Sequence, residues 1–258
     1  MSLSVGDAVG DGIDRLTDGR LAAVFAAFYA AHLLVNVGTQ SQLAAQRETF
    51  EEDAFVLDPE LLPPELPLAL ELPLGVATLL WTLATVALVA ISLLALRALC
   101  TDDRPGELTD GLLVGTVHGV AAALFLGVAV GVGLLLLVLP GLFLAAALAF
   151  TYPYVAVDRE NALEAMRRSW SLTSGHRLRV FAVLVAIVLT FFTISFVGGA
   201  IALALGAFPL LAEFTNVAFV TLAWLASLAI LASAFDQLEA ARAEAEAKWE
   251  GIDDELLP

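Results

Sequence analysis

The chain is poor in the residues from which active sites and crosslinks are built. Its 258 residues include one cysteine, Cys100, and three histidines, His32, His118 and His176. A single cysteine excludes an intrachain disulfide, and so few soft ligands leave little material for a metal site. The signatures HExxH, GxSxG, CxxC and the phosphate-binding loop are absent from the sequence. We therefore expect no metal, no cofactor, no catalytic residue and no enzymatic activity.

Positive charge is scarce as well. Lys248 is the one lysine, and 12 basic residues stand against 28 acidic ones, for a formal net charge of −16. Without a basic stripe the surface offers no footprint for the phosphates of nucleic acid, which excludes nucleic acid as a partner. The acid-rich, lysine-poor composition resembles that of haloarchaeal proteins, whose acidic surfaces stay hydrated in concentrated salt. A GC-rich genome with ordinary acidic loops would produce the same composition.

Charge is also missing from the middle of the long apolar runs, which Glu71 and Glu213 touch only at their margins. The mean hydropathy is +0.88 and 60% of the residues are hydrophobic. A charge at mid-bilayer costs about 2.5–3.5 kcal/mol, and about 20 apolar residues cross the hydrocarbon layer. These runs predict an all-α, integral membrane bundle with six spans. The predicted spans are 20–38, 74–98, 112–138, 141–157, 179–204 and 211–235.

The basic residues predict the orientation of these spans. Only Arg47 lies on one side of the membrane. The other side receives Arg15, Arg20, Arg97, Arg104, Arg159, Arg167, Arg168, Arg177, Arg179, Arg242 and Lys248. Since basic residues accumulate in cytoplasmic loops, both termini are predicted to be cytoplasmic, in a cell-membrane protein. The same alternation favours dividing 112–157 into a hairpin at the turn-forming pair Pro140-Gly141.

Residues 1–19 are predicted to form a cytoplasmic amphipathic helix. Val5, Val9, Ile13 and Leu16 recur at helical spacing, with aspartates on the opposite side. This helix would lie along the inner membrane surface or against the bundle. Its acidic composition lacks the basic start of a signal peptide, so we expect the first span to be retained.

Two other polar segments border the membrane domain, which is predicted to cover 20–235. The outer loop 39–73 is acidic and rich in proline, which breaks regular structure. Its carboxylates form either a solvated loop or a cation site. The cytoplasmic tail 236–258 is acidic, and it is predicted to extend the sixth span as a helix with the pair Arg242–Glu246 on its surface.

A cytoplasmic connector helix is predicted over 158–175. Asn161 can cap its start and Gly175 can end it. Its predicted apolar face consists of Leu163, Met166 and Trp170. Four arginines in and after this helix are candidates for contacts with lipid phosphates, or they serve only to orient the chain. These arginines are Arg167, Arg168, Arg177 and Arg179.

The third predicted span carries small residues at every fourth position. They are Gly115, Gly119, Ala123, Gly127 and Gly131. Such a strip lets helix backbones approach closely. It would serve packing within the chain or, alternatively, a seam between identical chains.

Polar side chains within the spans allow two interpretations. Tyr29, His32 and Asn36 share one face of the first span, and His118 lies in the third. They would line a polar pathway with titrating histidines, or they would form neutral hydrogen bonds between helices. With no arginine, lysine or carboxylate expected inside the bundle, the second interpretation is favoured.

Two neighbouring stretches resemble a known group of membrane proteins. Leu139-Pro140-Gly141 leads to Tyr152-Pro153-Tyr154, and residues 165–176 read AMRRSWSLTSGH. This order resembles the "PG, apolar helix, ALRRSW-x-L-T-x-G" pattern of YciC-like proteins, of the membrane domain attached to some glycerophosphodiester phosphodiesterases, and of many haloarchaeal membrane proteins of unknown function. The match is best over 139–185, with Met166 where leucine is common. The resemblance implies a six-span membrane protein and no substrate, and the phosphodiesterase catalytic domain is not present.

Together these features favour a multi-pass cell-membrane protein with a structural or accessory role. Its expected partners are membrane lipids and either another membrane protein or a second copy of itself. The alternative is a carrier or permease for a small or lipid-like substrate. The sequence shows no inverted repeat of the kind common in carriers, which weighs against this alternative.

Overall fold

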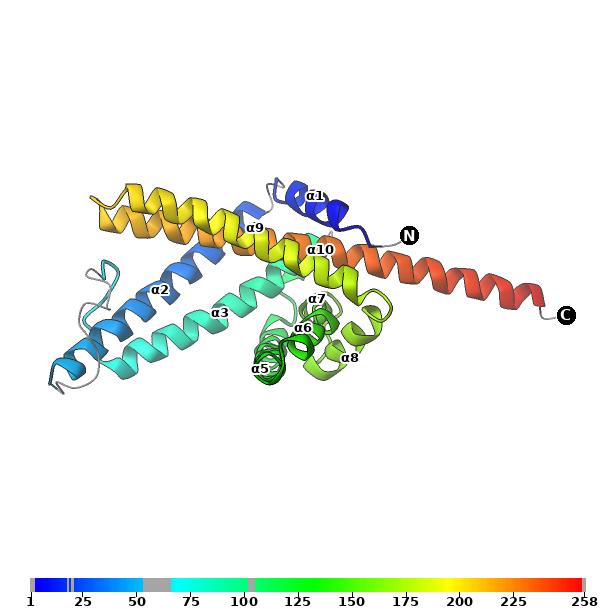
Figure 1. The fold of residues 1–258 in the computed structure, drawn as a ribbon, viewed down its shortest axis with the longest axis horizontal. Helices are drawn as coiled ribbons and strands as arrows, with labels where there is room; N and C mark the ends of the chain where they lie inside the picture. The colour runs from blue at the N-terminus through cyan, green and yellow to red at the C-terminus, as the bar shows by residue number, and fades with distance from the viewer. Residues whose placement is uncertain (1–2, 18, 20, 53–65, 102–104, 257–258) are drawn as a thin grey trace. The chain divides into compact units, whose positions relative to one another are not determined.

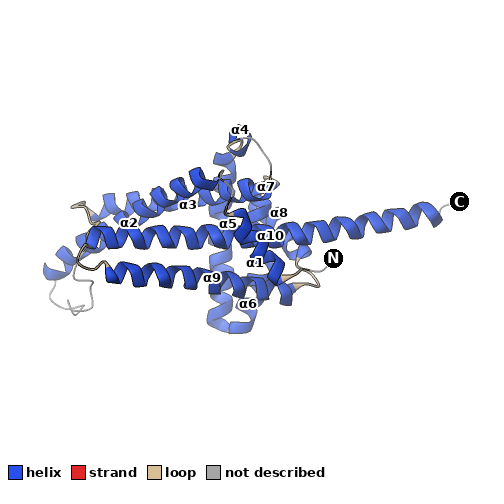
Figure 2. Cartoon of the chain, turned by 90° about the horizontal axis from the view of Figure 1, so that it is seen from above, coloured by secondary structure: helices blue, strands red, loops and turns tan. Residues whose placement is uncertain are grey.

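The computed structural model describes residues 3–17, 19, 21–52, 66–101 and 105–256. Within them the chain is all-α, as predicted, and Figure 2 shows no strand in this part of the chain. The helices, labelled in Figure 1, are α1 (Val5–Arg15), α2 (Leu21–Glu52), α3 (Leu74–Cys100), α4 (Pro105–Leu108), α5 (Leu112–Leu136), α6 (Val138–Ala147), α7 (Thr151–Val157), α8 (Ala162–Leu172), α9 (Arg177–Ala204) and α10 (Pro209–Leu256).

Among the described residues, six helical stretches are long and apolar enough to cross a membrane. They are Leu21–Arg47, Leu74–Cys100, Leu112–Leu136, Val138–Val157, Arg177–Ala204 and Pro209–Lys248. The predicted number and order of spans are thereby confirmed. The chain has the architecture of a multi-pass membrane protein.

The helices form two compact units. Unit 1 comprises Met1–Leu21, Ser92–Thr190 and Leu225–Pro258, and unit 2 comprises Ala22–Ile91 and Phe191–Trp224. The boundaries between the two units fall within α3, α9 and α10, and the membrane domain over 20–235 stays a prediction.

In unit 1, α5 and α6 form a tight hairpin. The turn lies at Leu137, whose backbone is extended (φ −158°, ψ 130°), so the predicted turn at Pro140-Gly141 is wrong by three residues. Proline is tolerated in the first turn of a helix, and Pro140 stands there in α6. Gly141 has a different use, because a Cβ on Gly133 would lie 2.8 Å from the Gly141 Cα. Glycine at both positions lets the two helix backbones touch.

The small residues of the predicted strip on α5 differ in burial. Gly115 and Gly119 are buried, and a Cβ on Gly115 would make ordinary contacts with Arg97 and Leu93 at 3.5 and 3.7 Å. Ala123 and Gly131 are half-buried, and Gly127 is exposed. A Cβ on Gly127 or Gly131 would meet no other described atom within 4 Å. Among the described residues only the start of the strip, Gly115 and Gly119, is buried, and a seam between copies stays a prediction for the rest.

The fourth span is broken. We expected one helix over 141–157, but α6 ends at Ala147 and α7 begins at Thr151. Neither piece reaches the length of about 20 residues that a continuous span needs. Figure 1 shows α5–α8 in green, and α5 packs against α6, α7 and α8. The break is therefore enclosed by helices of the same unit.

The amphipathic helix α1 packs against α10 within unit 1. A Cβ on Gly12 would lie 2.8 Å from the backbone of Ile230, so contact with the bundle is the correct alternative. The predicted face is wrong in detail, since Ala8 and Gly12 are buried whereas Ile13 is 46% exposed. Small residues line this side of α1 because the two backbones approach closely.

Two helices run beyond the predicted spans. Residues 39–52 of the predicted outer loop continue α2, so that loop is shorter than expected, and residues 53–65 lie outside the described residues. The tail continues α10 as one 48-residue helix, about 70 Å at 1.5 Å per residue. On its surface Arg242 bonds to Glu246 at 2.8 Å, which confirms the predicted solvated helix.

In unit 2, α2 holds the chain that enters α3. Gln40 Oε1 accepts a hydrogen bond from the Leu68 backbone N–H at 2.8 Å, and Ser41 Oγ accepts one from Leu70 at 2.9 Å. Gly38 lets the two helices approach, because a Cβ there would lie 2.9 Å from Trp81. The backbone of residues 68–70 is thus fixed by side chains of the first span.

The α5–α6 hairpin provides a test of close packing. We expect Gly133→Ala to lower the free energy of unfolding by about 1–3 kcal/mol, because the added methyl would overlap the Gly141 backbone. Gly127→Ala is the matched control in the same helix, and it should be neutral or slightly stabilising. Thermal unfolding of the purified protein in detergent measures both. Equal effects of the two substitutions would contradict the hairpin contact.

Candidate functional site: the broken fourth span

At the break between α6 and α7, backbone groups form hydrogen bonds with two side-chain hydroxyls, from α8 and the residue that follows it. Ser169 Oγ accepts a hydrogen bond from the Phe150 backbone N–H at 3.1 Å and donates one to the Ala147 carbonyl at 3.0 Å. Thr173 Oγ1 donates to the same carbonyl at 3.2 Å. Ser169, Thr173 and Phe150 are each 0% exposed. Buried backbone groups need such partners because leaving one unbonded costs about 1–3 kcal/mol.

The short helix α8 is built to bring these hydroxyls to the break. Asn161 caps it by accepting the Glu164 N–H at 3.0 Å, as predicted, and Gly175 follows its end in the left-handed region (φ 83°). Its buried side is made of small residues, Ala162, Ala165 and Ser169, together with Leu172. The predicted apolar face is wrong, since Leu163 and Trp170 are 58% and 42% exposed. A larger buried side chain would hold α8 away from the backbone it must reach.

Arg168 joins α8 to the end of α7. Its Nη1 lies 2.6 Å from Asp158 and 2.5 Å from Glu160, and its guanidinium stands 4.3 Å above the Tyr154 ring. Burial opposes its charge, but the hydrogen bond with Glu160 and the two carboxylates outweigh that effect and raise the pKa of Arg168 above its ordinary value. This arginine is engaged by carboxylates of its own chain, which favours a structural role for it over a lipid contact.

Tyr154 connects α7 to α10 at the same place. The side chain is 0% exposed, and its hydroxyl donates to the Glu239 carboxylate. The ring meets Phe235 edge to face, with centroids 5.1 Å apart. Aromatic packing and a charge-assisted hydrogen bond thus act on one side chain.

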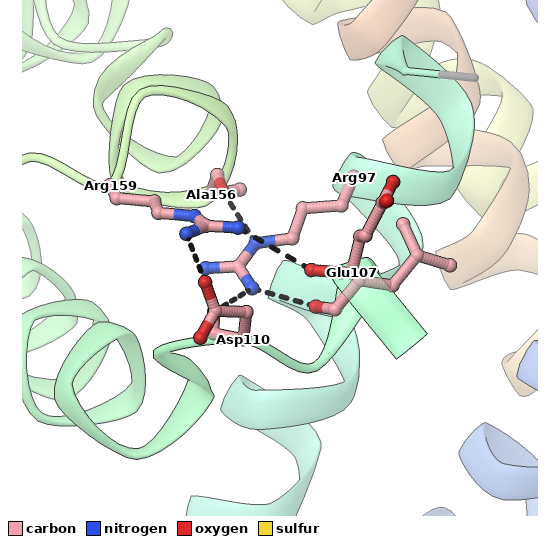
Figure 3. A network of polar contacts seen from close by, with 6 residues as sticks. Arg97, Glu107, Asp110, Ala156 and Arg159 are labelled. Atoms are coloured by element: carbon pink, nitrogen blue, oxygen red, sulfur yellow. Dashed lines mark hydrogen bonds and ion pairs between the residues drawn. The ribbon is translucent and has the colours of Figure 1, made fainter. Parts of the chain in front are cut away.

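Arg97 forms a second polar contact next to the break, drawn in Figure 3. Only 2% exposed, it donates from Nε to the Ala156 carbonyl at 2.6 Å, and from Nη1 to the Leu108 and Asp110 carbonyls at 2.7 and 2.9 Å. Arg159 pairs with the Asp110 carboxylate at 2.6 Å. A cation suits the carbonyl end of α7, and the planar guanidinium serves several acceptors at once.

The expectation that no arginine would be buried in the bundle is therefore wrong. Arg97 had been counted as a loop residue that orients the chain, although it lies inside the predicted span 74–98. Its position within an apolar run was the available signal, because a charge there requires partners within the protein. Sequence reasoning missed Ser169 and Thr173 as well, since hydroxyls in a polar connector are unremarkable without the break beside them.

A third contact in unit 1 involves Arg15 of α1. Its Nη1 lies 2.7 Å from the Asp236 carboxylate and donates to the Leu99 carbonyl at 2.9 Å. The contact joins α1, α3 and α10. In unit 1, Arg168, Arg97 and Arg15 thus each bind carbonyls or carboxylates of the same unit.

The other candidate arginines differ in their surroundings. Arg167 is exposed and lies 3.6 Å from Glu164. Arg179 is also exposed. Arg177 is half-buried and lies over the rings of Phe143 and Trp170.

In unit 2 the predicted polar pathway consists of groups that bond to their own helices and neighbours. His32 is 6% exposed, and its Nδ1 lies 3.1 Å from the Phe28 carbonyl and 3.2 Å from Thr221 Oγ1. Asn36 donates to the His32 carbonyl at 2.9 Å, and Tyr29 donates to the Phe214 carbonyl at 3.3 Å. This geometry favours neutral hydrogen bonding. His118 is half-buried and belongs to unit 1, whereas His32 belongs to unit 2.

No group of three or more histidine, cysteine, aspartate or glutamate side chains within the described part of the chain is arranged to hold a metal ion. The architecture and the enclosed break define a multi-pass, all-α membrane protein. The chain belongs to the family described as a domain of unknown function (DUF7847), whose model matches residues 3–238. No curated protein and no solved structure matches the chain. The resemblance to YciC-like proteins stays a prediction.

Replacing the hydroxyl at the break should destabilise the protein. We expect Ser169→Ala to lower the free energy of unfolding by about 2 kcal/mol, because it leaves the buried Phe150 N–H without its acceptor and removes one of the two hydroxyls that donate to the Ala147 carbonyl. Ser171→Ala is the matched control on the exposed side of α8, and it should stay within about 0.5 kcal/mol of the parent protein. Thermal unfolding in detergent gives both values. A Ser169→Ala protein as stable as the control would show that these bonds contribute nothing.

Proposed function

We propose that this protein is a non-enzymatic structural or accessory protein of the cell membrane. The observation that carries the proposal is the way the broken span is filled. In carriers, the ends of broken helices near the middle of the membrane bind ions and substrates. Here Ser169 and Thr173 hydrogen-bond to the backbone groups at the break, the Phe150 N–H and the Ala147 carbonyl. The break therefore serves to dock α8 rather than to bind a passing substrate.

The charged groups of unit 1 support the same function. Arg97 donates hydrogen bonds to three backbone carbonyls, Arg168 pairs with two carboxylates, and Arg15 pairs with Asp236. Such contacts hold helices in one arrangement, and the buried contacts of Arg97 would be the most costly to break. A fixed arrangement suits a protein that presents a surface to a partner.

A carrier for a small or lipid-like substrate is the competing function. Its best support is His32, a buried imidazole that bonds to Thr221 on a neighbouring helix. We favour the structural role because Thr221 also donates to its own Val217 carbonyl at 2.7 Å. His32 Nδ1 then bears a hydrogen that is shared by two acceptors, the Phe28 carbonyl and Thr221 Oγ1. That geometry is complete without a substrate.

Native mass spectrometry of protein extracted gently from its own membrane tests this proposal. We expect a stoichiometric complex with another membrane protein or a second copy, unchanged by His32→Leu, because that histidine has only a packing role. A lone protomer that retains one defined small molecule, and loses it on His32→Leu, would establish the carrier instead. Gel filtration of the variant checks that it still folds.

We further propose that both termini face the cytoplasm. Six spans return the chain to the side on which it started, and the connector between the fourth and fifth spans carries Arg159, Arg167 and Arg168. Arg47 alone is predicted to lie on the other side. This asymmetry is what the positive-inside rule uses.

Cysteine labelling tests the orientation. Cys100→Ala removes the one native thiol, after which Glu71→Cys or Ser174→Cys adds one in an exposed loop. We expect a membrane-impermeant maleimide to label intact cells through Glu71→Cys only, because that loop lies outside. Ser174→Cys should react only after the cells are opened. The reverse labelling pattern would place the termini outside.

A further inference from the structure

Arg177 lies against two aromatic rings in unit 1. Its guanidinium carbon lies 4.4 Å from the centre of the Phe143 ring and 4.6 Å from that of Trp170. The rings are 5.6 Å apart at 75°. The three side chains come from α9, α6 and α8 respectively. Such cation–π contacts restrict the position of the guanidinium while leaving its N–H groups free to donate.

This arginine differs from its neighbours in lacking an anion. Arg159 pairs with Asp110, Arg167 with Glu164, and Arg168 with Asp158 and Glu160. Among the described residues Arg177 has no carboxylate partner, and its buried Nε has no hydrogen-bond acceptor. A buried guanidinium nitrogen without an acceptor is unfavourable, so this arginine is suited to an anion from outside the chain.

An open pocket adjoins Arg177. It has a volume of about 470 Å³ and is lined by the residues from Gly175 to Arg179, including His176. The exposed Arg179 adds a second positive charge. Arg177 is also the first residue of the 28-residue helix α9, whose N-terminal end favours negative charge. A compact oxyanion such as phosphate fits this combination, since guanidinium groups bind phosphate through paired hydrogen bonds.

The rings indicate where that phosphate comes from. Phe143 and Trp170 are 41% and 42% exposed, and Arg177 stands where the fifth candidate span begins. Tryptophan is enriched at the membrane–water interface, where one side meets acyl chains and the other meets head groups. A lipid would satisfy both parts of the site, with its phosphate on the arginine and its chains against the rings.

We propose that Arg177, held against the rings of Phe143 and Trp170, binds the phosphate of a phospholipid head group, with Arg179 as the second cation. Of the four arginines that the sequence suggested, Arg168 is engaged by carboxylates, and Arg167 is exposed without an aromatic support. The site is thus specific to the turn between α8 and α9. It acts independently of the proposed structural role, since a carrier could hold a lipid there equally well.

Lipid titration followed by native mass spectrometry tests the site. The full-length protein in detergent is titrated with phosphatidylglycerol at constant ionic strength. We expect Arg177→Gln to weaken binding about tenfold, because it removes the charge-assisted hydrogen bonds. Arg167→Gln is the matched control, with the same loss of charge one turn away from the site, and it should change binding less than about twofold. If both variants lose the same affinity for phosphatidylglycerol, the binding is a general attraction between arginines and lipid, and the proposal is overturned.

Two further arms complete the experiment. Arg177→Lys retains the charge but not the planar stacking, so it should fold and bind less tightly than the parent protein. Unchanged affinity in this variant would overturn the role of the aromatic pair. Inorganic phosphate is added as a competitor at concentrations matched to the lipid. If it displaces phosphatidylglycerol, the site is one for free phosphate and the lipid assignment is wrong.

Discussion

Backbone hydrogen bonding at the broken fourth span is the constraint on which unit 1 depends. In a bilayer each unbonded backbone group costs several kcal/mol, so a break in a span is tolerated only where the protein supplies partners. Ser169 and Thr173 supply them. For their hydroxyls to reach the Ala147 carbonyl, α8 must lie close to the break, which accounts for the alanines on its buried side. The Asn161 cap and the turn at Gly175 then define the length of that helix.

The charged residues of unit 1 follow from the same need. Arg97, Arg15 and Arg168 each bind carbonyls or carboxylates from other segments of the chain. These contacts use the arginines to hold helix ends together rather than to present charge at a surface. Arg177 is arranged differently, against two partly exposed rings and with no carboxylate partner among the described residues. The contrast separates arginines that stabilise the fold from one whose surroundings are suited to a ligand.

Much of the architecture could be predicted because the bilayer imposes a length and a polarity on each span. The six spans, the capped connector helix and the helical tail follow from apolar runs, from Asn161 and from periodic charge. The break at Ala147–Thr151 could not be predicted, since the residues around it are as apolar as those of a continuous helix. The close contact between Gly133 and Gly141 could not be predicted from the sequence either. Glycine spacing shows where backbones can meet but not which partner they meet.

The sequence by itself determined that this chain is a multi-pass, all-α membrane protein, because hydropathy and run length report directly on transfer into hydrocarbon. Tertiary structure alone decided which polar side chains form hydrogen bonds and ion pairs within the protein. Arg97, predicted to be an orienting loop charge, is a buried residue that donates to three carbonyls, and Arg168, a candidate for a lipid contact, pairs with two carboxylates. The physical reason is that a hydrogen bond depends on distance and direction between groups far apart in sequence. Composition and periodicity along a single helix carry no record of those distances.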